Sequence, residues 1–262
     1  MAAPPAAPPE WLAPALMAWA DRGLGARLAA LYQRLPPTTC ARQGYCCGLL
    51  PPLAPVEMLA WLAGESQAVL VERSAHLADL VEHFLMNAAQ RRPCPWAAPG
   101  ACARYEGRFL ACRAYGLWSP QAYAQRRQEA LEASRAVARA WAGLGVELPT
   151  EVLEAGPGYC RHVRLCSDGE KIPRGDLALS GLEEELAQMA QELDCANELI
   201  GLGGDLSYLA ARLALGPQAC LVAKVRMTRD LLAGRETEAQ ELLARCREQA
   251  RAWALAWPGV AP

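Results

Sequence analysis

The sequence has few of the residues from which most enzyme active sites are built. It contains three histidines in 262 residues and no Gly-x-Ser-x-Gly motif. The stretch GLGGD at 201–205 follows no predicted strand and is not followed by Lys-Ser or Lys-Thr, which a phosphate-binding loop requires. Few histidines leave little material for general acid–base chemistry. The sequence therefore favours neither a hydrolase nor a nucleotide-binding protein, and it identifies no catalytic residue.

Charge runs and long apolar runs are also missing. The 26 basic and 28 acidic residues nearly cancel, so no nucleic-acid partner is expected. Every apolar stretch is interrupted before the ~18 residues that a membrane span needs. The proline-rich start lacks the basic residues and continuous apolar core of a signal peptide. We expect a cytoplasmic protein that has no membrane partner.

Alternation of β-branched and aromatic residues with polar ones is nearly absent, which indicates few strands. Apolar residues at helical spacing instead predict a mostly α fold. Pro55, the Ser119–Pro120 pair and Ser180 are typical of helix starts, and Gly234 is typical of a break. The expected helices cover residues 10–35 (one helix, or two broken near Gly23 and Gly25), 55–64, 66–90, 119–143, 180–200, 205–215 and 217–257.

Two stretches, 91–119 and 156–177, lose this periodicity and contain proline, glycine and cysteine instead. We therefore predict a helical bundle that carries an irregular, cysteine-rich metal-binding module. Its parts are an N-terminal helical segment (1–37), the module (38–118) and a C-terminal helical segment (119–262) with a second cysteine-containing loop. We expect these parts to pack as one compact domain.

Cysteine is unusually frequent for a chain of this length, with eleven residues. A reducing compartment keeps disulfides open, and an odd number cannot all be paired. Cys195, Cys220 and Cys246 lie in predicted helices and are expected to be core residues. The other eight lie in irregular stretches, from which separate thiolates can converge on one metal ion. These candidate ligands are Cys40, Cys46, Cys47, Cys94, Cys102, Cys112, Cys160 and Cys166. The alternative is a set of reduced, buried thiols.

The spacing of these cysteines excludes generic patterns. No C-x2-C pair occurs, so neither a zinc ribbon nor a bacterial ferredoxin motif is present. Cys46 and Cys47 are adjacent, and neighbouring side chains of an extended chain point to opposite sides. Both can serve one ion only if the chain turns tightly there; otherwise one of them serves a second site or is a free thiol.

The segments CARQGYCCG, PLAPVEMLAWLAG and CPWAAPGACARYEGRFLACRAYG resemble the YkgJ-like cysteine-cluster family, whose members are described as zinc- or iron-chelating proteins. The family pattern reads C-x2-C-G-x-C-C, then an acidic helix start, then C-P-aromatic, and later C-x-x-Y-x-x-R-P-x-x-C-R. The resemblance covers about residues 40–116. The matching positions are Cys40, Gly44, Cys46, Cys47, Glu57, Cys94, Pro95, Trp96, Cys102, Tyr105, Arg108, Cys112 and Arg113.

Two positions depart from the family pattern. Gln43 replaces its second cysteine, and Phe109 replaces a proline. If the family site uses the second cysteine, another donor must replace it, and Cys160 or Cys166 is the natural supply. His162 lies between them and is either a further ligand or a solvated side chain. The other alternative is a site with one fewer thiolate.

Four thiolates around Zn²⁺ or an oxidised four-iron cluster leave a charge near −2, which nearby cations must offset in a buried site. Several arginines lie within a few residues of candidate ligands, although an arginine-rich surface would look the same. They are Arg91, Arg92, Arg104, Arg108, Arg113, Arg161 and Arg164.

A second stripe of possible ligands follows one face of the helix predicted at 66–90. Glu72, His76, Asp79 and His83 fall within a ~60° arc opposite the apolar face. Ligands on one straight helix cannot surround an ion, so we interpret this stripe as a solvated surface.

We therefore predict a metal-binding protein that holds an iron–sulfur cluster, in the 4Fe–4S form, or zinc, and that has a redox or accessory role. Flagellin lysine methylases carry a related cysteine motif, so one alternative is a metal-dependent enzyme that modifies a protein or small molecule. Another is a helical interaction scaffold with a structural metal and a protein partner. The sequence does not choose between these functions.

Overall fold

The computed structural model describes residues 6–40, 45–98, 101–154, 156, 158–166, 176–193 and 195–257, apart from the side chains of Cys40, Tyr45, Leu165 and Leu177. Gln43 and Gly44 of the cysteine motif therefore lie outside the described residues, as does the Cys40 thiol.

The protein is mostly α-helical, as predicted, with twelve α-helices in the described part of the chain. They are α1 (Leu12–Asp21), α2 (Leu24–Gln33), α3 (Pro55–Gln67), α4 (Leu70–Met86), α5 (Leu110–Ala114), α6 (Pro120–Gly143), α7 (Thr150–Leu153), α8 (Asp176–Gln191), α9 (Ala196–Ile200), α10 (Leu206–Leu215), α11 (Pro217–Leu232) and α12 (Glu236–Leu255).

Local signals fix several helix ends. Gly23 and Gly234 adopt the left-handed backbone, with φ of 58° and 70°, which glycine tolerates without a steric penalty. They separate α1 from α2 and α11 from α12, so both predicted breaks are confirmed. The Ser119 hydroxyl accepts a hydrogen bond from the Ala122 N–H at 3.1 Å and caps α6, which begins at the predicted place.

The prediction that a helix begins at Ser180 is wrong, because Ser180 lies inside α8. That helix begins at Asp176, whose carboxylate accepts hydrogen bonds from the backbone N–H and hydroxyl of Ser119 at 2.9 and 2.6 Å. This contact joins the starts of two helices that are 57 positions apart. Sequence periodicity cannot reveal such a contact, since it depends on tertiary packing.

Short elements occupy the stretches that were expected to be irregular. β1 (Thr38–Cys40) pairs with β4 (Val163–Leu165), and β2 (Ala97–Ala98) pairs with β3 (Ala101–Cys102), both antiparallel. A 3₁₀ helix, η1 (Tyr45–Gly48), follows β1, and α5 also lies in such a stretch. Two or three residues are too few for an alternating pattern, so these strands left no signal in the sequence.

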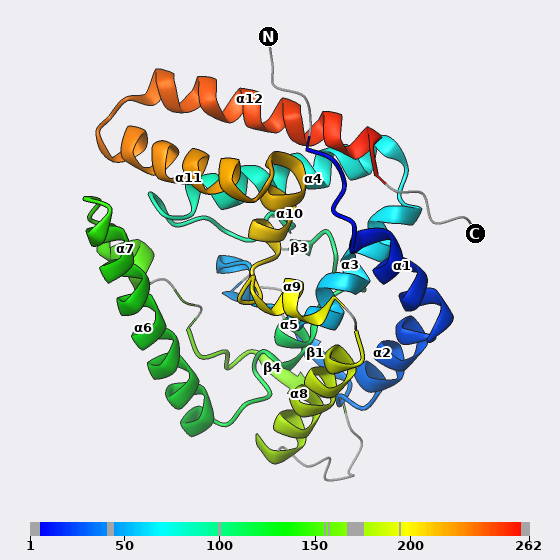
Figure 1. The fold of residues 1–262 in the computed structure, drawn as a ribbon. Helices are drawn as coiled ribbons and strands as arrows, with labels where there is room; N and C mark the ends of the chain where they lie inside the picture. The colour runs from blue at the N-terminus through cyan, green and yellow to red at the C-terminus, as the bar shows by residue number, and fades with distance from the viewer. Residues whose placement is uncertain are drawn as a thin grey trace.

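Helix α4 lies at the centre of the bundle and packs against α10, α11 and α12. In Figure 1, α11 and α12 run side by side in a hairpin that lies over α4. The predicted apolar face of α4 is buried at Leu77, Val81 and Phe84, whereas Leu70 in its first turn is exposed. The same hydrophobic core extends from Leu12 to Trp257 and takes residues from all three predicted segments.

Helix α6 is the exception to this packing. It has no buried residue and lies with α7 along one edge of the molecule (Figure 1).

Within the described residues, no single helix has both the length and the apolar character needed to cross a membrane. Helices α10 and α11 have the required length and apolar character only when the two are counted as one segment, and that segment is bent by 113° where they meet.

Candidate functional site

Cysteines from four separate places in the chain line one cavity, which we call the thiol cavity. It encloses about 60 Å³, room for a few water-sized groups. Trp96 and Phe109 supply apolar walls, while Arg104, Arg108 and His162 supply polar ones. The cysteines that line it are Cys46, Cys47, Cys94, Cys102, Cys112 and Cys160.

The adjacent pair Cys46 and Cys47 lies in η1, which is the tight turn that such a pair requires. Their Sγ atoms are 3.9 Å apart and both line the cavity. Zinc–sulfur bonds of ~2.3 Å in a tetrahedron place sulfur atoms about 3.8 Å apart. The spacing of the two thiols is therefore compatible with ligation of one ion by both.

The next two cysteines are tied to this turn through the backbone. The Cys94 N–H donates to the Cys47 carbonyl at 2.9 Å, which holds the two cysteine stretches together. The chain then reverses in the β2–β3 hairpin, where Ala97 lies opposite Cys102. This hairpin returns Cys102 toward Cys94, so that both line the cavity. Cys112 arrives separately, on the one-turn helix α5.

The pairing of β1 with β4 brings the second cysteine loop to the first. Cys40 lies opposite Val163, and the Cys166 N–H donates to the Pro37 carbonyl at 2.9 Å. Cys160, before β4, is buried and lines the thiol cavity, whereas Cys166, after β4, is exposed and does not line it.

Close approach at Gly116 makes this arrangement of Cys160 possible. Gly116 has φ of 87°, and a Cβ added there would lie 2.8 Å from the Val163 side chain and 3.3 Å from the Cys160 Cβ. Any larger residue would push the Cys160 loop away from the cavity.

The thiol groups influence one another's ionisation. The pKa of Cys47 rises to about 12, mainly through burial and with contributions from charge repulsion by Cys46, Cys102 and Cys94. The pKa of the Cys94 thiol rises to about 11, mainly through burial, although Arg104 opposes the shift. Burial also raises the pKa of Cys112, with repulsion from the same neighbouring thiols. Without a cation, these thiols are therefore protonated at neutral pH.

The described side chains nevertheless do not form a ready-made coordination sphere. Among them, no group of three or more His, Cys, Asp or Glu residues is placed to hold a metal ion. The chemistry of the donors does suit a soft metal, because thiolates bind zinc and iron–sulfur clusters. Metal ligation would release the thiol protons and replace mutual repulsion by attraction to a shared cation.

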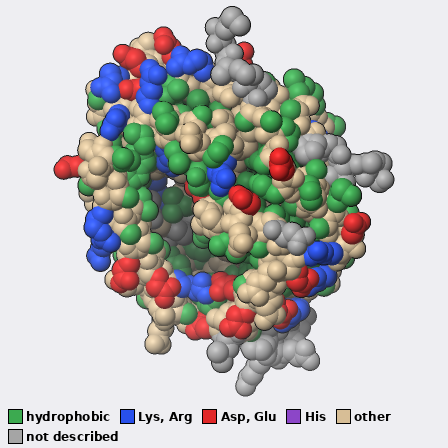
Figure 2. Space-filling view, viewed as in Figure 1, with side chains coloured by type: hydrophobic (Ala, Val, Ile, Leu, Met, Phe, Trp, Pro, Cys, Tyr) green, Lys and Arg blue, Asp and Glu red, His purple; other side chains and the backbone are tan. Residues whose placement is uncertain are grey.

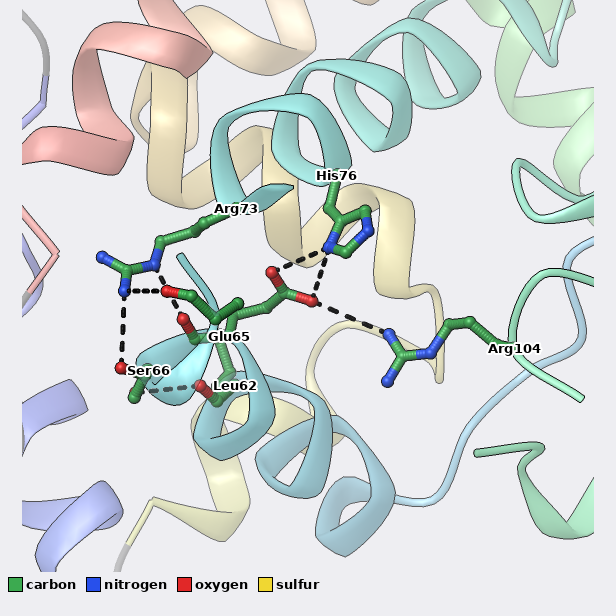
Figure 3. A network of polar contacts seen from close by, with 7 residues as sticks. Leu62, Glu65, Ser66, Arg73, His76 and Arg104 are labelled. Carbon is green, nitrogen blue, oxygen red and sulfur yellow. Dashed lines mark hydrogen bonds and ion pairs between the residues drawn. The ribbon is translucent and has the colours of Figure 1, made fainter. Parts of the chain in front are cut away.

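A buried ion pair lies beside the thiol cavity. The Glu65 side chain is 3% exposed, and both of its carboxylate oxygens lie 3.0 Å from His76 Nδ1. Arg104 Nη1 lies 3.7 Å from the same carboxylate (Figure 3). The hydrogen bond to Glu65 raises the pKa of His76, although burial opposes this shift.

Arg104 therefore lies between a carboxylate and the thiols. Its guanidinium is 4.8 Å from the Trp96 ring and 5.8 Å from the Phe109 ring. Its Nη1 atom is buried without a hydrogen-bond partner among the described residues. Burial lowers the Arg104 pKa, while Glu65, together with Cys102 and Cys94 once these are ionised, favours its charged form. It is placed to offset an anionic centre in the cavity.

The remaining arginines near the cysteines have different surroundings. Arg108 also lines the cavity and lies over the Tyr105 ring at 3.8 Å. Arg92 pairs with Glu82 at 2.7 Å, and Arg113 binds the Arg108 and Glu106 carbonyls. Three further arginines are exposed and do not line the thiol cavity: Arg91, Arg161 and Arg164.

Glu57 belongs to the cysteine motif but does not line the cavity. It is 2% exposed, and its Oε1 accepts hydrogen bonds from the Tyr32 hydroxyl at 2.5 Å and the Leu110 N–H at 2.6 Å. Its Oε2 accepts from the Ala54 N–H at 3.1 Å at the start of α3. Glu57 therefore ties α5, which carries Cys112, to α3 and α2.

The prediction that the Glu72, His76, Asp79 and His83 stripe of α4 is a solvated surface is wrong for its two histidines. Glu72 and Asp79 are exposed, but His76 is half-buried and His83 is 6% exposed. The physical reason is tertiary packing, which a helical projection of α4 alone does not include: His76 meets Glu65 of α3, and His83 lies near Asp205 before α10 and Lys224 of α11. The prediction that Cys195, Cys220 and Cys246 are core residues is confirmed, since all three are buried.

Comparison of the chain with protein-family models, curated proteins and solved structures finds no match, so the comparisons assign it to no family.

Proposed function

We propose that this protein binds an iron–sulfur cluster or a zinc ion through its loop cysteines. The observation that carries this proposal is the meeting of six cysteines, from four places in the chain, around one cavity. Packing alone does not need so many thiols in one place. The resemblance to the YkgJ-like family agrees with this proposal but stays a prediction.

The proposed ligands are those cysteines whose thiols face the cavity. Cys46, Cys47, Cys94, Cys102 and Cys112 are the main candidates, and Cys160 would replace the cysteine missing at Gln43. Cys40, whose thiol lies outside the described residues, stays a predicted ligand. Zinc bound here would stabilise the loops, and an iron–sulfur cluster would supply electron transfer. Arg104 would offset the negative charge of the thiolates in either case.

The proposal implies a compartment that keeps thiols reduced, and we place the protein in the cytoplasm. The ten cysteines with described side chains are all free thiols. Five of them are buried and four are half-buried, but Cys166 is exposed and would be open to oxidation outside a reducing compartment.

Anaerobic purification tests the proposal directly. We expect the protein to retain iron and sulfide with a broad absorbance near ~400 nm, or to retain zinc without that absorbance. Cys94→Ser and Cys112→Ser should each abolish retention of the metal. Cys246→Ser is the matched control, because Cys246 is a buried cysteine of α12 outside the cavity and its loss should leave the metal content unchanged.

Full metal content in both cavity variants would contradict the ligand assignment. Equal loss in all three variants would show that folding, rather than ligation, was affected. Protein reconstituted anaerobically with iron and sulfide, and separately with zinc, distinguishes a missing metal from an absent site.

A further inference from the structure

A second, larger cavity lies on the other side of η1, and we call it the His83 cavity. It has a volume of about 440 Å³ and lies between α4, α11 and the edge helices α6 and α7. Figure 2 shows the surface hollowed between α6 and the body of the molecule, with mainly hydrophobic side chains inside. Its size is within the range of small-molecule sites.

Most of the cavity wall is apolar. Leu49 and Leu50 follow η1, Val137 and Trp141 come from α6, and Leu153 comes from α7. Val137 lines the cavity and is 49% exposed, because nothing in α6 is fully covered by the rest of the protein. These side chains give the cavity a surface that suits an apolar group.

The opposite wall carries a buried histidine. His83 is 6% exposed, and among the described residues neither ring nitrogen makes a hydrogen bond of ordinary geometry, although the Arg92 backbone lies close enough to raise the His83 pKa as an acceptor. Burial lowers the pKa of His83 to about 4, with Lys224 and Arg92 adding to this and Asp205 opposing it. The neutral ring offers one donor and one acceptor, and leaving both unused is costly unless a ligand or water binds them.

Lys224 lies beside this histidine. Its Nζ donates to Asn87 Oδ1 at 2.7 Å and lies 4.0 Å from the centre of the Phe84 ring, which leaves two of its three donors for other partners. Burial lowers the pKa of Lys224 to about 8, against the attraction of Asp205. It therefore keeps its charge at neutral pH.

The charges around the cavity leave one positive charge in excess. Lys224 and Arg91 are cationic, and Asp205 is anionic. Arg92 also lines the cavity, but it belongs to a group of ion pairs with Glu82, Arg247 and Asp79, whose two positive and two negative charges cancel. Asp205 is already used as the cap of α10, where Oδ1 accepts from the Tyr208 N–H at 3.0 Å. The excess matches one negative charge on a ligand, not two.

We infer that the His83 cavity binds a small organic monoanion, with a carboxylate near Lys224 and His83 and an apolar chain or ring against α6 and α7. This inference does not depend on the proposed metal. The two sites share a wall, because Leu50 lines both cavities and Arg91 packs on Gly48 of η1. A bound carboxylate would therefore lie next to the segment that carries Cys46 and Cys47.

Octanoate is a suitable probe, with octylammonium and 1-octanol as controls of equal chain length. We expect calorimetry on the full-length protein to give one octanoate site, with both controls binding at least about tenfold more weakly, or about 1.4 kcal/mol. NMR of ¹⁵N-histidine-labelled protein should show the His83 ring signals moving on titration while those of the exposed His162 stay in place. His83→Gln assigns the signals.

Variants locate the site. Lys224→Met keeps the aliphatic chain over Phe84 but removes the charge, so octanoate affinity should fall about tenfold or more. Arg226→Met is the matched control, because Arg226 is on the same helix but outside the cavity, with its side chain 57% exposed. Ala133→Trp fills the cavity from α6, which contributes no core residue, and should block binding without affecting folding.

Several outcomes would overturn the inference. These are equal affinity for the three probes, an unmoved His83 signal at saturation, or unchanged octanoate affinity in both Lys224→Met and Ala133→Trp. If Lys224→Met does not fold, the Ala133→Trp variant and the NMR titration of the unmodified protein decide the question. Octanoate binding that persists after removal of all metal shows that the site is independent of the metal centre.

Discussion

The carboxylate of Glu57 accepts a hydrogen bond from the Leu110 N–H at 2.6 Å, across 53 positions of sequence. The same Oε1 atom accepts from the Tyr32 hydroxyl, and Arg113 lies 4.7 Å from the centre of the Tyr32 ring. A single buried side chain thus joins α2, α3 and α5. Because α5 carries Cys112, this bond also sets where one thiol enters the cavity.

We predict that Glu57→Ala lowers the free energy of unfolding by about 3 kcal/mol, because it leaves the buried Leu110 N–H without an acceptor. Glu57→Gln should cost only about 1 kcal/mol, since its carbonyl oxygen can keep the two bonds now made to Oε1 and only the bond from the Ala54 N–H is lost. Urea denaturation measures both values. Equal costs for the two variants would contradict this role for Glu57.

The positions of Cys160 and Cys166 separate two cysteines that the sequence treats alike. Cys160 lines the thiol cavity and Cys166 does not. Under the proposed function, Cys160→Ser should lower zinc affinity about tenfold or more, whereas Cys166→Ser should leave it unchanged. Competition with a chromophoric chelator measures both affinities. A larger loss in the Cys166 variant would reverse the assignment.

Arg104→Met should weaken zinc binding about tenfold, because it removes a cation that interacts with Cys94 and Cys102 while keeping apolar contact with Trp96. Arg126→Met is the control, since Arg126 also lies over a tryptophan, Trp118, but outside the cavity. Chelator competition at two salt concentrations checks the electrostatic origin of the effect. Equal affinity in both variants would argue against a charge-balancing role for Arg104.

Acid should destabilise the protein through His83. Its pKa falls from 6.5 to about 4 on folding, so the unfolded chain binds the extra proton between these values. The stabilising contribution is present above pH ~6.5 and is lost as the pH falls toward ~4. When the pH is lowered from ~7 to ~5, the free energy of unfolding of the unmodified protein should fall by about 2 kcal/mol more than that of the His83→Gln variant. Denaturation curves for both proteins at the two pH values provide the test.

Local sequence signals were sufficient for most helices. The apolar spacing in α4, the Ser119 cap and the glycines at 23 and 234 each act within a few residues, so their effects can be recognised without the fold. The grouping of cysteines in irregular stretches likewise indicated which thiols lie outside the long helices, although Cys112 lies on the one-turn helix α5. Burial of Cys220 and Cys246 followed from their helical positions, whereas Cys195 is buried although it lies just before α9.

Tertiary structure alone decided which cysteines share a cavity and which histidine is buried. The pairing of β1 with β4 directs Cys160 inward and leaves Cys166 exposed, and η1 turns Cys46 and Cys47 to the same cavity. His83 is buried because α10 and α11 pack against α4. Backbone periodicity sets the direction of a side chain relative to its own helix or strand, but contacts between distant segments determine what that side chain faces.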